Sequence, residues 1–198
     1  MDEAIALCKT TWRYRETQVR ETLTGTRKLV TRRRPTKHIL MFVAAAISTC
    51  SRSARIYEAS YISEVGRPWA DLKAKLYYRA APDETVSAIK QAPTIPIGEG
   101  LLKSMIRRHA AGDRYVVEFK GKPVDCKKAF VNTVERARKA YPKLFHRPDG
   151  TPKEVVRHTL RHTGITWRAM QGIDPLRNLQ VRRIDAGNVR ACLQPPSS

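Results

Sequence analysis

A run of consecutive apolar residues, Ile39 to Ile47, sets the centre of the fold. A helix that is apolar on every side has no face suited to solvent, so this run predicts a buried helix. Pro35 stands just before it as a start signal. A polar turn over residues 48–53 follows, and a second, shorter helical piece is expected through residues 56–57.

The remaining pattern predicts an α+β fold, mainly α, with one small antiparallel sheet. Short segments rich in aromatic or β-branched residues are typical of strands, and apolar residues three and four apart are typical of helices. Proline in a first turn and glycine after a last turn mark the ends of the final helix. The expected elements are strands at 76–78 and 93–97, and helices at 101–106, 127–141 and from about 151 to 170 or 171, the last one stopped by Gly172.

Composition divides the chain into three parts. Residues 1–35 are polar and basic, and their few apolar residues keep no long register, which predicts an arm or linker. Such an arm is either a solvated tail or a segment that contacts phosphates. Residues 36–174 form the expected globular domain. Residues 175–198 form an Arg-rich tail whose composition resists packing, so we expect it to be disordered.

The charge of the chain indicates its kind of partner. Lys and Arg outnumber Asp and Glu by 38 to 18, which gives a formal net charge of +20. This excess is far larger than solubility requires, so the partner is expected to be polyanionic. Nucleic acid is the leading candidate, because a protein that neutralises phosphates releases condensed counterions. An acidic membrane surface is the weaker alternative.

Several classes of protein are not expected. No stretch approaches the roughly 20 apolar residues of a membrane-spanning helix, and the first residues lack the basic-then-apolar order of a signal peptide. We therefore expect a cytoplasmic protein with no membrane partner. Cys8, Cys50, Cys126 and Cys192 lack the close pairing of metal or redox motifs and are expected to be reduced thiols. No cofactor and no metal are expected.

One segment carries most of the chemistry: residues 158–167 read His-Thr-Leu-Arg-His-Thr-Gly-Ile-Thr-Trp. On a helix, His158, Arg161 and His162 share one face, because side chains three and four apart are neighbours. Such a face suits a phosphodiester, since Arg grips two phosphate oxygens and His exchanges a proton near neutral pH. The two histidines also have the spacing of a zinc pair, but the glutamate of H-E-x-x-H is missing and Arg161 would repel a metal. A structural helix with a solvated charged face is the other alternative.

This segment closely resembles the second conserved box of the tyrosine recombinases of the phage-integrase kind. That box reads His-x-x-Arg-His-Thr and continues with a small residue, a Thr and an apolar or aromatic helix, as residues 158–167 do here. In the family the box gives a His and an Arg to the scissile phosphate. The resemblance therefore implies catalytic roles for His158 and Arg161, with His162 and Thr163 as supporting positions.

The turn after the apolar helix resembles the first box of the same family, Thr-Gly-x-Arg. Here residues 49–52 read Thr-Cys-Ser-Arg. The resemblance implies that Arg52 clamps the same phosphate as Arg161. Two positions depart from the family pattern, because Cys50 replaces the usual Gly and Arg55 stands where many relatives have an acidic or small residue.

Between the two boxes, the family has a β-hairpin whose Lys acts as general acid, close before a strand that ends in a Val-Pro-like pair. Residues 93–97 resemble that strand, and the nearest upstream Lys is Lys90, which the resemblance implies as a catalytic residue. The resemblance covers roughly residues 36–174. It implies a tyrosine-recombinase catalytic-domain fold, with double-stranded DNA and other recombinase protomers as partners.

The nucleophile of the family is a Tyr that follows a third box, Leu-Gly-His or Gly-Trp-like, soon after the second box. Neither element occurs in residues 174–198, and the last Tyr of the chain is Tyr141, upstream of the second box. We therefore expect a degenerate integrase or site-specific recombinase of a mobile element, inactive alone, whose end was replaced by a reading-frame change near codon 175. One alternative is a non-enzymatic nucleic-acid-binding protein that only grips the phosphate backbone, and another is an unfolded relic that shows no cooperative melting.

Overall fold

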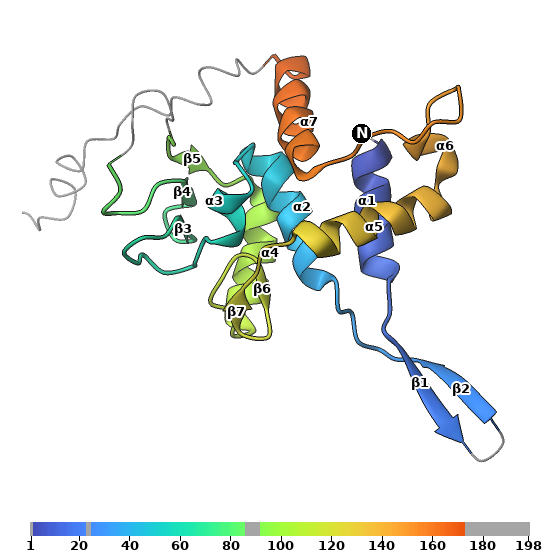
Figure 1. Cartoon of the computed structure of the whole chain (residues 1–198). Helices are drawn as coiled ribbons and strands as arrows, with labels where there is room; N and C mark the ends of the chain where they lie inside the picture. Colours follow the sequence, from blue (N-terminus) through green and yellow to red (C-terminus); the bar gives the residue numbers. More distant parts are fainter. Residues whose placement is uncertain (1, 23–24, 86–91, 173–198) are drawn as a thin grey trace, which may run out of the picture.

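The computed structural model describes residues 2–22, 25–85 and 92–172 (Figure 1). This part of the chain combines helices with small antiparallel sheets, in agreement with the predicted α+β class. The elements in chain order are α1 (Asp2–Arg13), β1 (Thr17–Thr22), β2 (Gly25–Val30), α2 (Lys37–Thr49), α3 (Ala54–Tyr57), β3 (Trp69–Asp71), β4 (Leu76–Tyr78), β5 (Ile95–Pro96), α4 (Glu99–Ala110), β6 (Glu118–Phe119), β7 (Lys122–Pro123), α5 (Lys127–Ala140), α6 (Pro142–Phe145) and α7 (Arg157–Met170). The predicted Arg-rich tail lies outside the described residues.

The predicted buried helix is α2, which lies at the centre of the described fold (Figure 1). It contacts α1, α3, α4 and α7, so its apolar side chains meet other helices on several sides. Ile39, Phe42 and Val43 are fully buried. Phe42 also meets Phe130 of α5 edge-on, with ring centroids 6.1 Å apart. This packing confirms the buried helix that the apolar run predicts.

The first helix corrects the predicted arm. Residues 2–13 form α1, which contacts α2 and α5 and contributes to the core. Its buried face includes Ala4, Leu7 and Thr11, which lie three and four residues apart. Only Leu7 among these three is a large apolar residue. Alanine and threonine give a weak hydrophobic signal, so the helical register is hard to see in the sequence.

The next segment keeps the character of an arm. β1 and β2 pair antiparallel, with Thr17 opposite Val30. The hairpin projects away from the helices (Figure 1). The side chains of Val19 and Val30 are 60% and 72% exposed, so the rest of the described chain does not cover them. The predicted arm is thus reduced from residues 1–35 to this hairpin and its base.

β3, β4 and β5 form the small antiparallel sheet that the sequence predicts at residues 76–78 and 93–97. Tyr77 of β4 pairs with Ile95 of β5, and both side chains are fully buried. Across β3 and β4, Trp69 stacks on Tyr78 with ring centroids 4.4 Å apart. β3 is an addition to the prediction, because its residues Trp-Ala-Asp are not a run of the aromatic or β-branched types that mark the other two strands.

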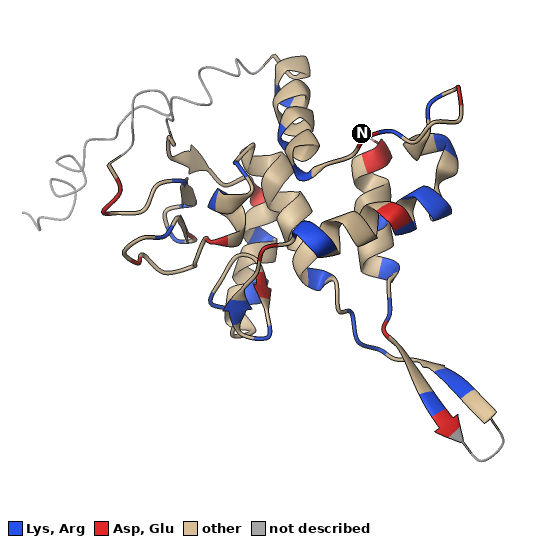
Figure 2. Cartoon of the chain, viewed as in Figure 1, with Lys and Arg blue, Asp and Glu red and all other residues tan. Residues whose placement is uncertain are grey.

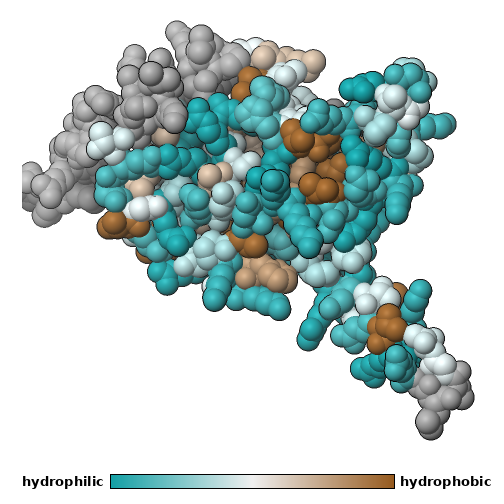
Figure 3. Space-filling model, in the orientation of Figure 1, coloured by the Kyte–Doolittle hydropathy of each residue, from teal (hydrophilic) through white to brown (hydrophobic). Residues whose placement is uncertain are grey.

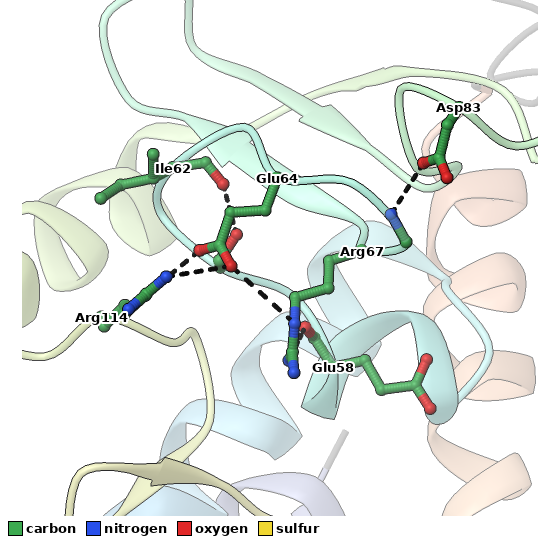
Figure 4. A network of polar contacts seen from close by, with 8 residues as sticks. Glu58, Ile62, Glu64, Arg67, Asp83 and Arg114 are labelled. Atoms are coloured by element: carbon green, nitrogen blue, oxygen red, sulfur yellow. Dashed lines mark hydrogen bonds and ion pairs between the residues drawn. The ribbon is translucent and has the colours of Figure 1, made fainter.

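The loop between α3 and β3 is held by a network of polar contacts (Figure 4). Arg114 donates from Nε to the Glu64 carboxylate at 3.2 Å. The backbone N–H of Gly66 donates to the Asp83 carboxylate at 2.7 Å. The loop is therefore fastened both to the segment after α4 and to the segment after β4.

The last helix begins later than predicted. Residues 151–156 are not helical: Pro152 forms a β-bridge with His146, and Val156 has the extended backbone angles of an N-cap. The backbone N–H of Val156 donates to Oγ1 of Thr159 at 3.2 Å. This hydrogen bond satisfies a backbone N–H that has no partner within the helix. The predicted end is confirmed, because α7 stops at Met170 and Gly172 has a φ of 72°.

The surface of the molecule is mostly hydrophilic on the face shown in Figure 3. Hydrophobic residues gather there in small patches, one of which lies over α1, where Ile5 is 43% exposed. Within the described residues, the structure contains no helix with the length and apolar character needed to cross a membrane.

Candidate nucleic-acid interface

The two predicted boxes meet where α7 packs against the end of α2 (Figure 1). Gly164 lies at this contact. A Cβ atom placed on it would be 2.3 Å from the carbonyl oxygen of Ile47 and 2.9 Å from Sγ of Cys50. Real Cβ atoms do not approach a backbone so closely, so only glycine allows these two helices to touch here. The second box therefore lies directly against the turn that carries the first box.

That turn is built around Cys50, which has a left-handed backbone with φ 50° and ψ 29°. Glycine adopts this conformation without strain, which accounts for a Gly at this position in the family pattern. Beside it, the Thr49 hydroxyl lies 2.8 Å from the Ser51 hydroxyl. Burial raises the pKa of the Cys50 thiol, although Arg168 and Arg79 act in the opposite direction. The thiol is therefore neutral near pH 7 and supplies no negative charge to the turn.

Two further arginines cap this end of α2. The last turn of α2 contains no basic residue. Arg79, directly after β4, donates to the carbonyl oxygen of Thr49 and from Nε to the Ser51 hydroxyl at 3.0 Å. Arg168 of α7 donates to the carbonyl oxygen of Ser48. Cations at a helix C-terminus satisfy its free carbonyl groups and interact favourably with its dipole.

Arg79 is a buried cation in an electropositive setting. The residue is only 4% exposed. Burial, and after it the charge of Arg161, lowers its pKa to about 10. No carboxylate is among the groups that shift this pKa. Arg79 therefore adds a fixed positive potential beside the turn after α2.

Arg52 and Arg161 lie close together at the same place. Arg52 is exposed on the turn, and Arg161 is half-buried on α7. Burial lowers the pKa of Arg161, and the charge of Arg52 lowers it further. Within the described residues, neither guanidinium has a hydrogen-bond or ion-pair partner. A bound anion would supply the missing counter-charge.

Other cations of the same segments are already paired. Arg55 binds both carboxylate oxygens of Glu84. Arg157, in the first turn of α7, forms an ion pair with Asp125. Arg55 and Arg157 therefore have structural partners, whereas Arg52 has none among the described residues. The pair with Glu84 also neutralises the charge of Arg55.

His158 and His162 lie on α7 as predicted, and both are exposed. Their rings meet edge-to-face, with centroids 4.4 Å apart. Neither imidazole forms a hydrogen bond with another residue in the described part of the chain. The two rings are therefore accessible to a ligand on the helix that carries Arg161.

The remaining predicted site residue, Lys90, lies outside the described residues. The seven tyrosines of the chain all lie within them. Four tyrosines have a raised pKa, and burial is the largest cause in each case: Tyr57, Tyr61, Tyr77 and Tyr78. A raised pKa disfavours the phenolate, so none of these four is an activated nucleophile.

Sequence reasoning missed Arg79 and Arg168, although each has a signal. Arg168 is two helical turns after Arg161, and residues seven apart share one helix face. Arg79 directly follows the apolar strand 76–78, where a charged residue is exceptional. Its destination, the end of α2, depends on how the sheet packs and is not visible in the sequence.

Positive charge is not confined to this site. Figure 2 shows Lys and Arg on the β1–β2 hairpin, on both ends of α5 and on the elements around β6 and β7. The positive charge is therefore spread over several elements of the described chain.

No model of a protein family matches the chain, and a search of curated proteins finds no match.

Proposed function

We propose that this protein binds double-stranded DNA through a tyrosine-recombinase-like catalytic domain that grips a phosphate with Arg52 and Arg161. One observation carries the proposal: the packing of α7 on α2 brings together two arginines from distant parts of the chain, and neither has a counter-charge among the described residues. Arginine presents a planar fork of donors that matches two phosphate oxygens.

The surrounding residues support this role. Arg79 and Arg168 bind the carbonyl groups at the end of α2, so they add positive charge while leaving the phosphate contacts to Arg52 and Arg161. Preorganised cations stabilise the charge that develops on a phosphate in transfer reactions. His158 would donate a proton or a hydrogen bond to the same phosphate, and Lys90 would act as general acid, as the resemblance implies.

Binding without strand cleavage is the activity that these residues support. The family reaction needs a tyrosine hydroxyl that attacks phosphorus and forms a 3′-phosphotyrosyl bond while a 5′-hydroxyl leaves. All seven tyrosines precede the second box. We therefore expect no covalent protein–DNA product when the protein is incubated with duplex DNA and separated under denaturing conditions. A labelled adduct that survives denaturation would contradict this expectation, and its tryptic peptide would identify the nucleophile.

The alternative is a protein in which all cations bind the backbone equally, as the net charge of +20 would permit. The double variant Arg52→Gln/Arg161→Gln separates the two functions. If a phosphate site exists, it should weaken binding to a DNA duplex about 30-fold at fixed salt, because two charge-assisted contacts are lost. The measurement is a fluorescence-anisotropy titration at several salt concentrations.

The control is Lys73→Gln/Lys128→Gln, which removes two exposed cations elsewhere. It should weaken binding less than about fivefold through the general loss of charge. Equal losses in the two double variants would reject the phosphate site and favour diffuse binding.

A further inference from the structure

The base of the β1–β2 hairpin is fixed to the helical body. The Arg34 guanidinium lies over the Trp12 ring of α1, 3.4 Å from its centroid. Arg136 of α5 lies over the Tyr14 ring at 3.8 Å. The hydroxyl of Thr36 also donates to a carbonyl oxygen of α1, at 3.2 Å. These contacts hold the strands at a defined position even though the hairpin itself projects from the body (Figure 1).

The two faces of the hairpin differ in charge. Residues that pair directly across two strands lie on the same face. One face carries Arg20 opposite Arg27 and Gln18 opposite Leu29. The strand residue Glu21 pairs with Thr26 and therefore lies on the other face. The first face, the Arg20–Arg27 face, thus has two cations and no carboxylate from the strands.

This arrangement is unfavourable in the free protein. Like charges that lie directly opposite each other destabilise an antiparallel pair. Arg20 and Arg27 are both exposed, and neither forms an ion pair with a described residue. A two-stranded ribbon is also only marginally stable in water without a packed face. An anionic partner would remove the repulsion and cover the exposed strands.

We propose that the β1–β2 hairpin enters the major groove of B-form DNA with its Arg20–Arg27 face toward the base edges. This inference rests on the proposed DNA-binding function and adds a second contact outside the phosphate site. A two-stranded ribbon fits a B-form major groove, which is about 12 Å wide. The paired strands have six residues each, so the ribbon spans about 20 Å.

The chemistry of the face agrees with this partner. Arginine binds the O6 and N7 acceptors of guanine, and glutamine binds adenine, both from the major groove. The Arg20–Arg27 face presents these two residue types, since Gln18 lies beside the arginine pair. The major groove of A-form RNA is too deep and narrow for side chains to read, so duplex RNA should not be bound in this way.

The test compares variants of the full chain on one DNA duplex of roughly three helical turns and on an RNA duplex of the same sequence. Arg20→Gln/Arg27→Gln should weaken DNA binding about tenfold, more than the charge-matched control Lys73→Gln/Lys128→Gln. The RNA duplex should be affected no more by the hairpin variant than by the control. The single variants Arg20→Gln and Lys28→Gln compare the two faces, and Arg20→Gln should cost more.

Equal losses for the hairpin variant and the control, or equal losses on DNA and RNA, would overturn the inference. Hydrogen exchange gives a second readout that needs no mutation: DNA should protect the amides of β1 and β2, and unchanged exchange would also overturn it. Both arginines are exposed and repel each other, so the variants should melt no lower than the wild type. A failure of the proposed phosphate site would be seen separately, because only the Arg52→Gln/Arg161→Gln variant tests that site.

Discussion

Replacing Gly164 with alanine should lower the free energy of unfolding by about 3 kcal/mol, at the upper end of what overpacking costs. The new Cβ atom would lie 2.3 Å from the Ile47 carbonyl oxygen, so α7 must move away from α2. The higher helix propensity of alanine would return only about 1 kcal/mol. Urea unfolding followed by circular dichroism measures the change. Because the displacement separates Arg161 from Arg52, affinity for DNA should fall as well.

Gly100→Ala is the matched control. Gly100 is also a helical glycine, in α4, and a Cβ atom placed there meets nothing within 4 Å. This variant should be as stable as the wild type, or more stable by up to about 1 kcal/mol. If the two variants unfold at the same urea concentration, the close contact between α7 and α2 is wrong, and the position of the two boxes is wrong with it.

Acid should destabilise the protein through His38. This residue lies near the start of α2, is 5% exposed and contacts the Phe119 ring. Burial, together with the charge of Arg108, lowers its pKa from 6.5 to about 4. The unfolded chain binds a proton near pH 6.5 and the folded chain does not. Stability is therefore complete above pH 6.5 and is lost as the pH falls toward 4.

The expected loss between pH 7 and pH 4.5 is about 2 to 3 kcal/mol from this one group. His38→Phe removes the titration and keeps an aromatic ring beside Phe119. Between the two pH values, the free energy of unfolding of this variant should fall by about 2 to 3 kcal/mol less than that of the wild type. The titration of carboxylates affects both proteins equally. Urea unfolding of both proteins at the two pH values gives the difference. Parallel pH profiles would show that the His38 side chain is hydrated in the folded protein.

The parts of the fold that the sequence predicts best are those where large apolar residues gather. The run from Ile39 to Ile47 cannot be solvated, so α2 is visible without a structure. Gly172 gives α7 its predicted end, and the spacing of the second box places Arg161 on one helix face with His158. Local pattern alone does not bring Arg52 near Arg161, because their proximity depends on how α7 packs on α2. The family resemblance supplied that expectation.

The missed elements have physical causes as well. α1 buries small side chains such as Ala4, so its hydrophobic pattern is weak. α7 begins late because Pro152 forms a β-bridge with His146, six residues earlier, and this local pairing outweighs the proline signal at Pro152. Arg79 reaches the end of α2 through the packing of the small sheet. The position of Arg79 depends on contacts between distant residues, which single-sequence patterns do not report.

The packing of α1 against α5 also determines the order in which the nascent chain can fold. α1 leaves the ribosome well before α5, which begins only at Lys127. At ordinary rates of synthesis this is a delay on the order of ten seconds. During that interval Leu7 has no partner from α5 to bury it. α1 is therefore not fully enclosed until α5 has been made, and chaperones that bind exposed apolar side chains have time to act on it.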